Sequence, residues 1–180
     1  PFKLWLAKVG RERIDELEDP EIAINRALET YLRKGYSESW VNQRLKSIEV
    51  RKALTDEWDK GGIKKGLEYA ILTDEITKAW AGLTTKEYKQ LKNLKKENLR
   101  DNMTNMELIL NMLAEASTTE IAQGENPEGL EQHKKVARRG GKVAAKARQE
   151  LESESKRPVV TSLNAKSLKK KQIEEKEDAE

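Results

Sequence analysis

Residues 82–113 read GLTTKEYKQLKNLKKENLRDNMTNMELILNML, and this stretch indicates most clearly how the chain folds. It holds two capping-box patterns, Thr84 to Glu87 and Thr104 to Glu107. In a capping box the Thr hydroxyl accepts a hydrogen bond from the amide three residues on, and the Glu side chain reaches back to the Thr amide. The boxes predict one helix from about Thr85 and another from about Asn105, with a turn around residues 101–104.

The apolar residues of this stretch lie on one side of each predicted helix. Tyr88, Leu91 and Leu94 share one side of the first helix, and lysines occupy the other. The second helix carries a Met/Leu stripe, which we expect to be well buried because its members recur at helical spacing. The stripe comprises Met106, Ile109, Leu110, Met112, Leu113 and Ala116.

Apolar residues also recur at helical spacing on both sides of this stretch. The predicted helices there cover residues 2–17, 20–34, 38–60, 65–81 and 128–155. We therefore predict an all-α fold, an irregular bundle of about six or seven helices with an extended C-terminal helix and a disordered tail. The four Trp residues at positions 5, 40, 58 and 80 are expected to anchor the core, because each buries a large area.

Breaks in the pattern divide the chain into four predicted segments. Asp19-Pro20 restarts a helix, and Gln123 to Pro127 is the best linker. The segments are residues 1–18 (the last helix of an N-terminal domain), 19–123 (a helical core), 127–156 (a basic helix) and 157–180 (a flexible tail). Within the last of these, PVVTSL at residues 158–163 is the only hint of a strand, and it is too short to form a sheet alone.

The composition excludes several classes of protein. The chain has no Cys and one His, so disulfides, zinc sites with Cys ligands and His-pair metal sites are excluded, and we expect no cofactor or metal. No apolar run approaches the roughly 18 residues that cross a bilayer, and no signal peptide is visible. We expect a cytoplasmic protein without membrane contact. Because the chain starts at Pro1 directly on a helical pattern, we interpret it as a fragment of a longer protein.

Charge is distributed unevenly along the chain. Residues 11–30 hold three basic and seven acidic residues, whereas residues 132–149 hold seven basic and no acidic ones. These seven lie along one predicted helix opposite a small apolar face, and they are the first candidates for nucleic-acid binding: Lys134, Lys135, Arg138, Arg139, Lys142, Lys146 and Arg148. Such a cationic face binds phosphates through counterion release. A merely solvated charged face and a membrane-surface helix are the alternatives.

Residues 86–100 form a second basic patch, with six basic and two acidic residues. Lys89, Lys92 and Lys96 are the further nucleic-acid-binding candidates from this patch. Tyr88 is the only aromatic residue among the lysines, and stacking on single-stranded bases needs several exposed rings. We therefore expect backbone contact rather than base recognition, with a plain solvated face as the alternative. A helix-turn-helix at residues 85–113 is disfavoured, because the turn has no Gly and the second helix is too apolar for a major groove.

The remaining motifs carry little chemistry. Gly140-Gly141 lies inside the last predicted helix and costs it about 1 kcal/mol per Gly relative to Ala, which favours close helix packing over a hinge. The acidic clusters, such as Asp56, Glu57 and Asp59, are typical of solvated helix faces. Asp74 and Glu75 come nearest to a metal-nuclease pattern, and they equally suit the first turn of a helix. We predict that the protein is not an enzyme.

Several segments resemble one family. Gly82-x-x-x-Lys86, Leu94-Lys95-Lys96 and Asp101-x-Met103-x-x-x-Glu107-Leu108 are similar to the C-terminal region of phage antirepressor-type proteins with a Bro N-terminal domain, and to the bacterial DNA-damage-inducible protein D. Further similar segments are PFKLWLAKVGRERIDE (1–16), VRKALTDEW (50–58), GGKVAAKARQELE (140–152) and PVVTSLNA (158–165). The resemblance implies regulation around DNA in prophage or damage-response settings, with the Bro domain upstream as the DNA-binding part. It supplies no catalytic residues.

Two functions follow from these patterns. The first is a non-enzymatic, DNA-associated regulatory protein of antirepressor or DNA-damage-response type, whose basic helix contacts the DNA backbone. The second is a protein-interaction or oligomerisation module that binds a repressor or recombinase without touching nucleic acid. DNA is thus the expected partner, with a protein partner or a second copy of the chain as the alternatives.

Overall fold

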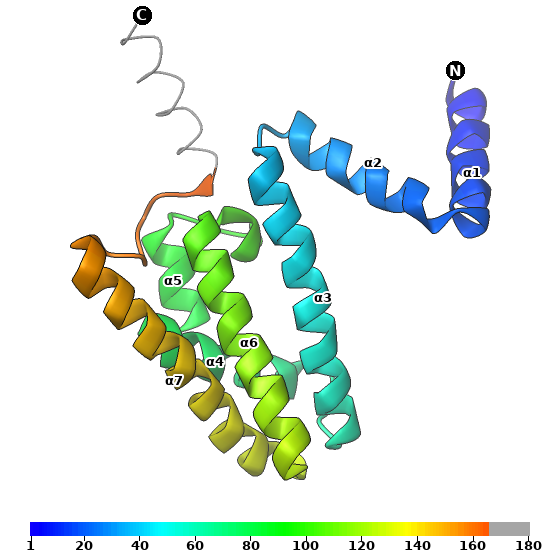
Figure 1. The fold of residues 1–180 in the computed structure, drawn as a ribbon. Coiled ribbons are helices and arrows are strands. Elements are labelled where there is room, and N and C mark those ends of the chain that lie inside the picture. Colours follow the sequence, from blue (N-terminus) through cyan, green and yellow to red (C-terminus); the bar gives the residue numbers. More distant parts are fainter. Residues whose placement is uncertain (166–180) are drawn as a thin grey trace, which may run out of the picture. The chain divides into compact units, whose positions relative to one another are not determined.

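A computed structural model describes residues 1–165 of the chain (Figure 1). Within these residues it contains seven α-helices, one 3₁₀ helix and no strand, which confirms the predicted all-α fold. The elements are α1 (Phe2–Glu18), α2 (Pro20–Arg33), α3 (Glu38–Lys60), α4 (Leu67–Ala81), α5 (Thr85–Leu91), the 3₁₀ helix η1 (Arg100–Asn102), α6 (Asn105–Glu125) and α7 (Gly129–Ser155). None of the described helices is both long and apolar enough to cross a membrane. Residues 166–180, which belong to the predicted flexible tail, lie outside the described residues.

Contacts divide the chain into two units, Pro1–Val41 and Asn42–Glu180. In the first unit the Asp19 side chain caps α2 by accepting a hydrogen bond from the Glu21 amide (3.0 Å), as its position before Pro20 predicts. Glu16 of α1 accepts from Arg26 of α2 at 2.6 Å, which joins the two helices. The prediction that Trp5 anchors a core is wrong, because its side chain stacks on Phe2 at the helix surface and is 57% exposed.

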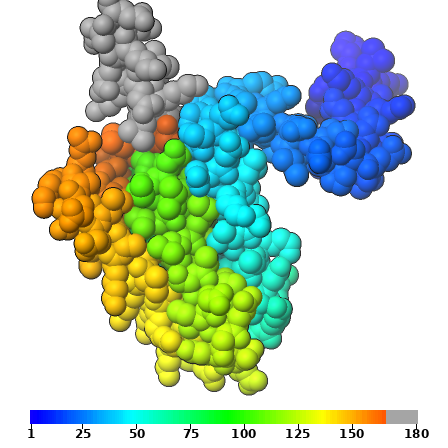
Figure 2. Space-filling model, in the orientation of Figure 1, coloured from blue at the N-terminus to red at the C-terminus, as the bar shows by residue number. Residues whose placement is uncertain are grey.

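The second unit is built around the close packing of α7 against α4 and α6 (Figure 1). The space-filling view shows the yellow N-terminal part of α7 directly beside the yellow-green C-terminal part of α6 (Figure 2). A side chain at Gly140 would meet the Thr118 backbone, with Cα and N each 2.6 Å from the added carbon, and one at Gly141 would meet Ala79 and the Ile76 carbonyl. Gly140-Gly141 is therefore a packing element, as the sequence predicts.

Large aromatic side chains fill the core of the second unit. Trp58, Trp80 and Tyr88 are fully buried, and Tyr69 meets Trp58 edge to face at 5.1 Å between ring centroids. Trp40, in the first unit, is also buried and stacks on Tyr36. Three of the four predicted Trp anchors are thus confirmed.

Both capping boxes form as predicted. Thr84 and Thr104 each accept the amide at the third helical position, and Glu87 and Glu107 each accept the amide of the capping residue. The first helix is shorter than the sequence suggests, because α5 ends at Leu91 and Asn93 follows in the left-handed region (φ 55°). Asn tolerates that conformation better than most residues, and it stops the helix there.

The expectation that the Met/Leu stripe of α6 is well buried holds for Leu110, which is 4% exposed, and is wrong for four of the other members. Met106, Ile109 and Leu113 keep 37–39% of their surface exposed, and Ala116 is also exposed. The helix instead buries a polar line, which includes Glu107, Asn111, Glu115 and Thr118. This line is stable in the interior because basic side chains from other elements neutralise both of its carboxylates.

Residues 158–163, where the sequence hints at a strand, form an irregular segment that contacts α6 and α7 within the second unit. The Val159 amide donates to Glu152 at 2.8 Å, and the Thr161 amide donates to Glu107 at 3.2 Å. The segment therefore completes the surroundings of the buried Glu107 carboxylate.

Candidate nucleic-acid interface

Helix α7 presents its basic residues in two groups, and the first group is bonded within the chain. Arg138 makes a bidentate pair with Glu75 of α4 at 2.7 and 2.9 Å, and Arg139 binds the Glu125 carboxylate at 2.6 and 2.8 Å. The Arg138 guanidinium lowers the pKa of Glu75, and Glu75 in turn raises the pKa of Arg138. The positive charge that the sequence gives to this helix is therefore partly neutralised by acidic residues from elsewhere.

Lys134 and Arg148 also belong to the bonded group. Lys134 pairs with Glu131 one turn earlier at 2.7 Å. Arg148 donates to the Ala81 carbonyl at 2.7 Å and lies 3.7 Å from Glu152, and only 18% of its side-chain surface is exposed. Arg148 thus holds the C-terminal half of α7 against the end of α4.

The second group is Lys135, Lys142 and Lys146. Their spacing of seven and then four residues places them in one stripe along α7. All three are exposed, and none makes an ion pair within residues 1–165. These lysines, rather than the arginines of the same helix, keep their charge available to a ligand.

The three candidates from the second basic patch, Lys89, Lys92 and Lys96, lie in three different environments. Lys92 is buried and pairs with Glu107 at 2.8 Å, so the prediction that it lies on the exposed side of its helix is wrong. Its position one helical turn from Tyr88 directs it inward, where the buried Glu107 carboxylate compensates its charge. Lys96 is exposed beyond the end of α5, and Lys89 lines a cavity.

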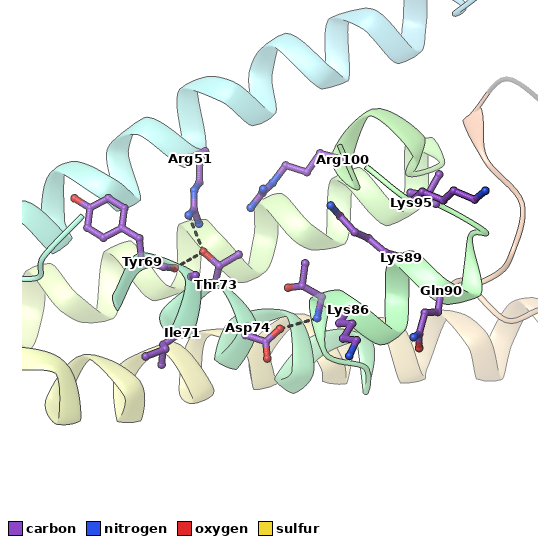
Figure 3. Close-up of a pocket in the computed structure, with 13 residues that line it drawn as sticks. Arg51, Tyr69, Ile71, Thr73, Asp74, Lys86, Lys89, Gln90, Lys95 and Arg100 are labelled. Atoms are coloured by element: carbon purple, nitrogen blue, oxygen red, sulfur yellow. Dashed lines mark hydrogen bonds between the residues drawn. The ribbon is translucent and has the colours of Figure 1, made fainter. Parts of the chain in front are cut away.

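Two hollows adjoin on this side of the second unit. The larger, about 820 Å³, lies among α3, α4, α5 and η1, and the smaller, about 480 Å³, lies between α4 and α7. Ile71 and Asp74 line both hollows, so the two meet at these residues. Basic side chains line the larger hollow from three directions, namely Arg51, Lys86, Lys89, Lys95 and Arg100 (Figure 3). Lys78, Arg138 and Lys142 line the smaller one.

The lysines of these hollows and of the α7 stripe form what we term the basic surface: Lys78, Lys86, Lys89, Lys95, Lys135, Lys142 and Lys146. No ion pair of these side chains occurs in the part of the chain that the structure describes. Lys142 belongs both to the stripe and to the smaller hollow, so it links the α7 lysines to those of α4 and α5. The fold thus joins the two basic segments that the sequence shows separately.

Sequence reasoning missed Arg51 and Lys78. Arg51 belongs to α3, where it stands between Val50 and Lys52, and these adjacent residues do not indicate that it faces α4 and η1. Its guanidinium lies 4.8 Å from the centre of the Trp58 ring and donates to Thr73 at 2.7 Å. The seven-residue spacing of Arg51 and Trp58 is the one signal that places Arg51 on the buried face.

The two acidic residues beside the basic surface, Asp74 and Glu75, already bind other groups of the chain. Asp74 accepts the Thr85 amide at 2.6 Å, and Glu75 binds Arg138. Among residues 1–165 no group of three or more His, Cys, Asp or Glu side chains is arranged to hold a metal ion. Asp74 and Glu75, which come nearest to a metal-nuclease pattern in the sequence, therefore make structural bonds within the chain.

Comparison with known proteins identifies the second unit. Residues 40–171 match the family described as the DinD C-terminal domain. The match begins within two residues of the unit that starts at Asn42. No curated protein matches the chain.

Proposed function

The chain belongs to the DinD C-terminal domain family, and from this premise we propose that it is a non-enzymatic regulatory protein of the DNA damage response whose basic surface binds the DNA backbone. The observation that carries the proposal is the set of seven lysines in α4, α5, the loop after α5 and α7 that make no ion pair with residues 1–165. A Lys side chain acts as a mobile point charge, which suits phosphates whatever the base sequence.

The proposal shifts the contact away from the α7 arginines. Arg138 and Arg139 can bind phosphate only after their ion pairs with Glu75 and Glu125 break. The seven lysines of the basic surface release only water and counterions when they bind phosphate. An upstream Bro-type domain and a prophage or antirepressor setting remain part of the proposal, on the resemblance of residues 82–113 and 1–16 to that family.

The test is fluorescence anisotropy of a labelled duplex across a salt series. A variant with Lys86, Lys89 and Lys142 changed to Gln is expected to bind more weakly, with a salt slope smaller by about 3 because each lost phosphate contact removes about one counterion. The matched control changes Lys46, Lys52 and Lys60 of α3 to Gln, which removes the same charge from lysines that pair with Glu49, Asp56 and Glu57. An equal loss in both variants, or no retention of DNA by the wild type at low salt, would contradict the proposal.

A second function, protein interaction or self-association, is favoured by the exposed stripe of α6. Met106, Ile109 and Leu113 lie at spacings of three and four residues on one face, each more than one third exposed. Apolar side chains gathered in this way are typical of protein-binding surfaces. Sedimentation of the wild type and of Ile109→Glu tests self-association: a mass that falls to that of one chain in the variant supports it, and one-chain mass in both opposes it.

A further inference from the structure

The floor of the larger hollow holds more positive charge than the described residues 1–165 balance. Arg51 and Arg100 approach the same oxygen of Glu115, at 3.3 and 2.6 Å. The two arginine side chains are 22% and 21% exposed and the Glu115 side chain is 1% exposed, so all three lie largely out of water. One carboxylate therefore serves two guanidinium groups, and burial lowers the pKa of Arg51 while Arg100 lowers it further. An anion entering the hollow would relieve this imbalance.

The side chains that line the walls of the hollow add further positive charge. Lys86, Lys89 and Lys95 line it and pair with no carboxylate in residues 1–165. Among residues 1–165 the lining contains one acidic side chain, Asp74, which accepts the Thr85 amide. Figure 3 shows Arg51, Arg100 and Lys89 extending from three different elements toward one space.

The size and the apolar lining of the hollow show what kind of anion fits. A volume of about 820 Å³ is far larger than a lone ion needs, and it lies within the range of small-molecule sites. Ile71, Leu94 and Tyr69 provide apolar surface beside the cations. The Tyr69 hydroxyl is engaged by Asp59, and burial raises its pKa to about 12, so the ring stays neutral. The site thus suits an anionic group attached to a flat or apolar body.

We propose that this hollow binds the terminal phosphate of a nucleotide, with the nucleoside against Ile71, Leu94 and Tyr69. A phosphate monoester carries about 1.5 to 2 negative charges at pH 7, whereas each phosphodiester of a strand carries one. Lys89 and the guanidinium nitrogens of Arg100 that do not bind Glu115 contact the phosphate oxygens, since Arg and Lys are the usual partners of such groups. The ligand is therefore a free nucleotide or the phosphorylated end of a strand. The inference rests on the proposed function for the lysines that both share, and it adds selectivity for a terminal phosphate.

The experiment compares a short labelled single strand carrying a 5′-phosphate with the same strand carrying a 5′-hydroxyl, using the whole chain. The phosphorylated strand is expected to bind at least about tenfold more tightly. Deoxyadenosine monophosphate and inorganic pyrophosphate, each at millimolar concentration, serve as unlabelled competitors. A preference for the phosphorylated strand supports a strand end as the ligand. Competition by the free monophosphate without such a preference supports a free nucleotide.

Three variants separate the hollow from general charge. Lys89→Gln and Arg100→Gln are expected to abolish the preference for the phosphorylated strand, and Lys89→Gln carries little risk to the fold because Lys89 makes no ion pair in the described residues. Lys146→Gln lies outside the hollow and is expected to weaken both strands alike, which leaves their ratio unchanged. Circular dichroism checks that each variant is folded.

Equal binding of the two strands, together with no competition from either free phosphate compound, would overturn the inference. A preference that survives Lys89→Gln and Arg100→Gln would also overturn it, because the phosphate would then bind elsewhere. Neither result affects duplex binding across the salt series, so failure of the terminal-phosphate site is distinguishable from failure of the proposed function.

Discussion

At the scale of single residues, Lys92 and Glu107 connect three parts of the second unit. Their charged groups lie 2.8 Å apart with both side chains fully buried. The Lys92 ammonium also donates to the Leu163 carbonyl, and Glu107 accepts the amides of Thr104 and Thr161. The pair therefore ties α5, the start of α6 and residues 158–163 together. Burial lowers the pKa of Lys92 and raises that of the neighbouring Tyr88.

Changing Lys92 to Met is expected to destabilise the protein by about 3–5 kcal/mol, because it leaves the Glu107 charge buried without a partner. The matched control is Lys96→Met, an exposed lysine four residues on, for which we expect a change within about 0.5 kcal/mol. Urea unfolding measures both. Equal effects at the two positions would show that Lys92 is not buried as described.

His133 makes stability depend on pH. The ring is buried beneath Gly61, and burial lowers the pKa of His133 from its ordinary value of 6.5, while Pro127 and Glu57 oppose this in part. The folded state thus favours the neutral ring. Its contribution to stability is complete above pH 6.5, and it is lost as the pH falls from there through the lowered folded pKa.

We expect His133→Leu to flatten this dependence. The free energy of unfolding of the wild type should fall between about pH 7 and pH 5 more steeply than that of the variant, because only the wild type takes up a proton at this position on unfolding. Urea unfolding across this pH range gives the two slopes. Parallel slopes would mean that another group causes the acid sensitivity.

At the scale of elements, the contact between α6 and α7 depends on residues without side chains. Gly140 lies against the backbone at Thr118, so the two helices approach more closely than Ala would permit. The Thr118 and Thr119 hydroxyls donate to carbonyls of their own helix, so these two buried groups are paired. The contact positions the lysine stripe of α7 beside α4.

Gly140→Ala is expected to destabilise the protein by about 1–3 kcal/mol, because overpacking outweighs the helix-propensity gain of about 1 kcal/mol. Gly124→Ala in α6 provides the contrast. No atom lies within 4 Å of a carbon added there, so we expect a neutral or slightly stabilising effect. Thermal unfolding of both variants tests the prediction, and stabilisation by Gly140→Ala would refute the close packing.

At the scale of the whole molecule, the unit that starts at Asn42 and the family match that starts at residue 40 have nearly the same beginning. This unit holds the basic surface, both hollows and the buried Lys92–Glu107 pair. A unit with its own core folds independently of its neighbours in many proteins. The division falls inside α3, whereas the sequence suggested residue 18 as the end of the first segment.

A chain that starts at Ser37, and so keeps the Ser37 cap of α3, is expected to unfold in a single cooperative transition. Its near-ultraviolet circular dichroism should retain the signals of the buried Trp58 and Trp80. Loss of those signals with helicity preserved would indicate a molten state, and it would show that residues 1–36 are needed for the core.

The sequence by itself determined the helices, both capping boxes, the burial of Trp40, Trp58 and Trp80, and the close packing at Gly140-Gly141. These features depend on residues within about four positions of one another or on the size of a side chain, and such information is local. It failed for Met106, Ile109 and Leu113 of the α6 stripe, because basic residues on other elements allow the polar line with Glu107 and Glu115 to be buried instead.

Only the tertiary structure decided which cations a ligand can reach. Lys89 and Lys92 lie three residues apart with the same side chain, yet one lines a hollow and the other is buried against Glu107. Arg138 is neutralised by Glu75, a residue 63 positions away. The availability of a charge depends on the long-range partners that the fold brings to it, and no local pattern in the sequence records them.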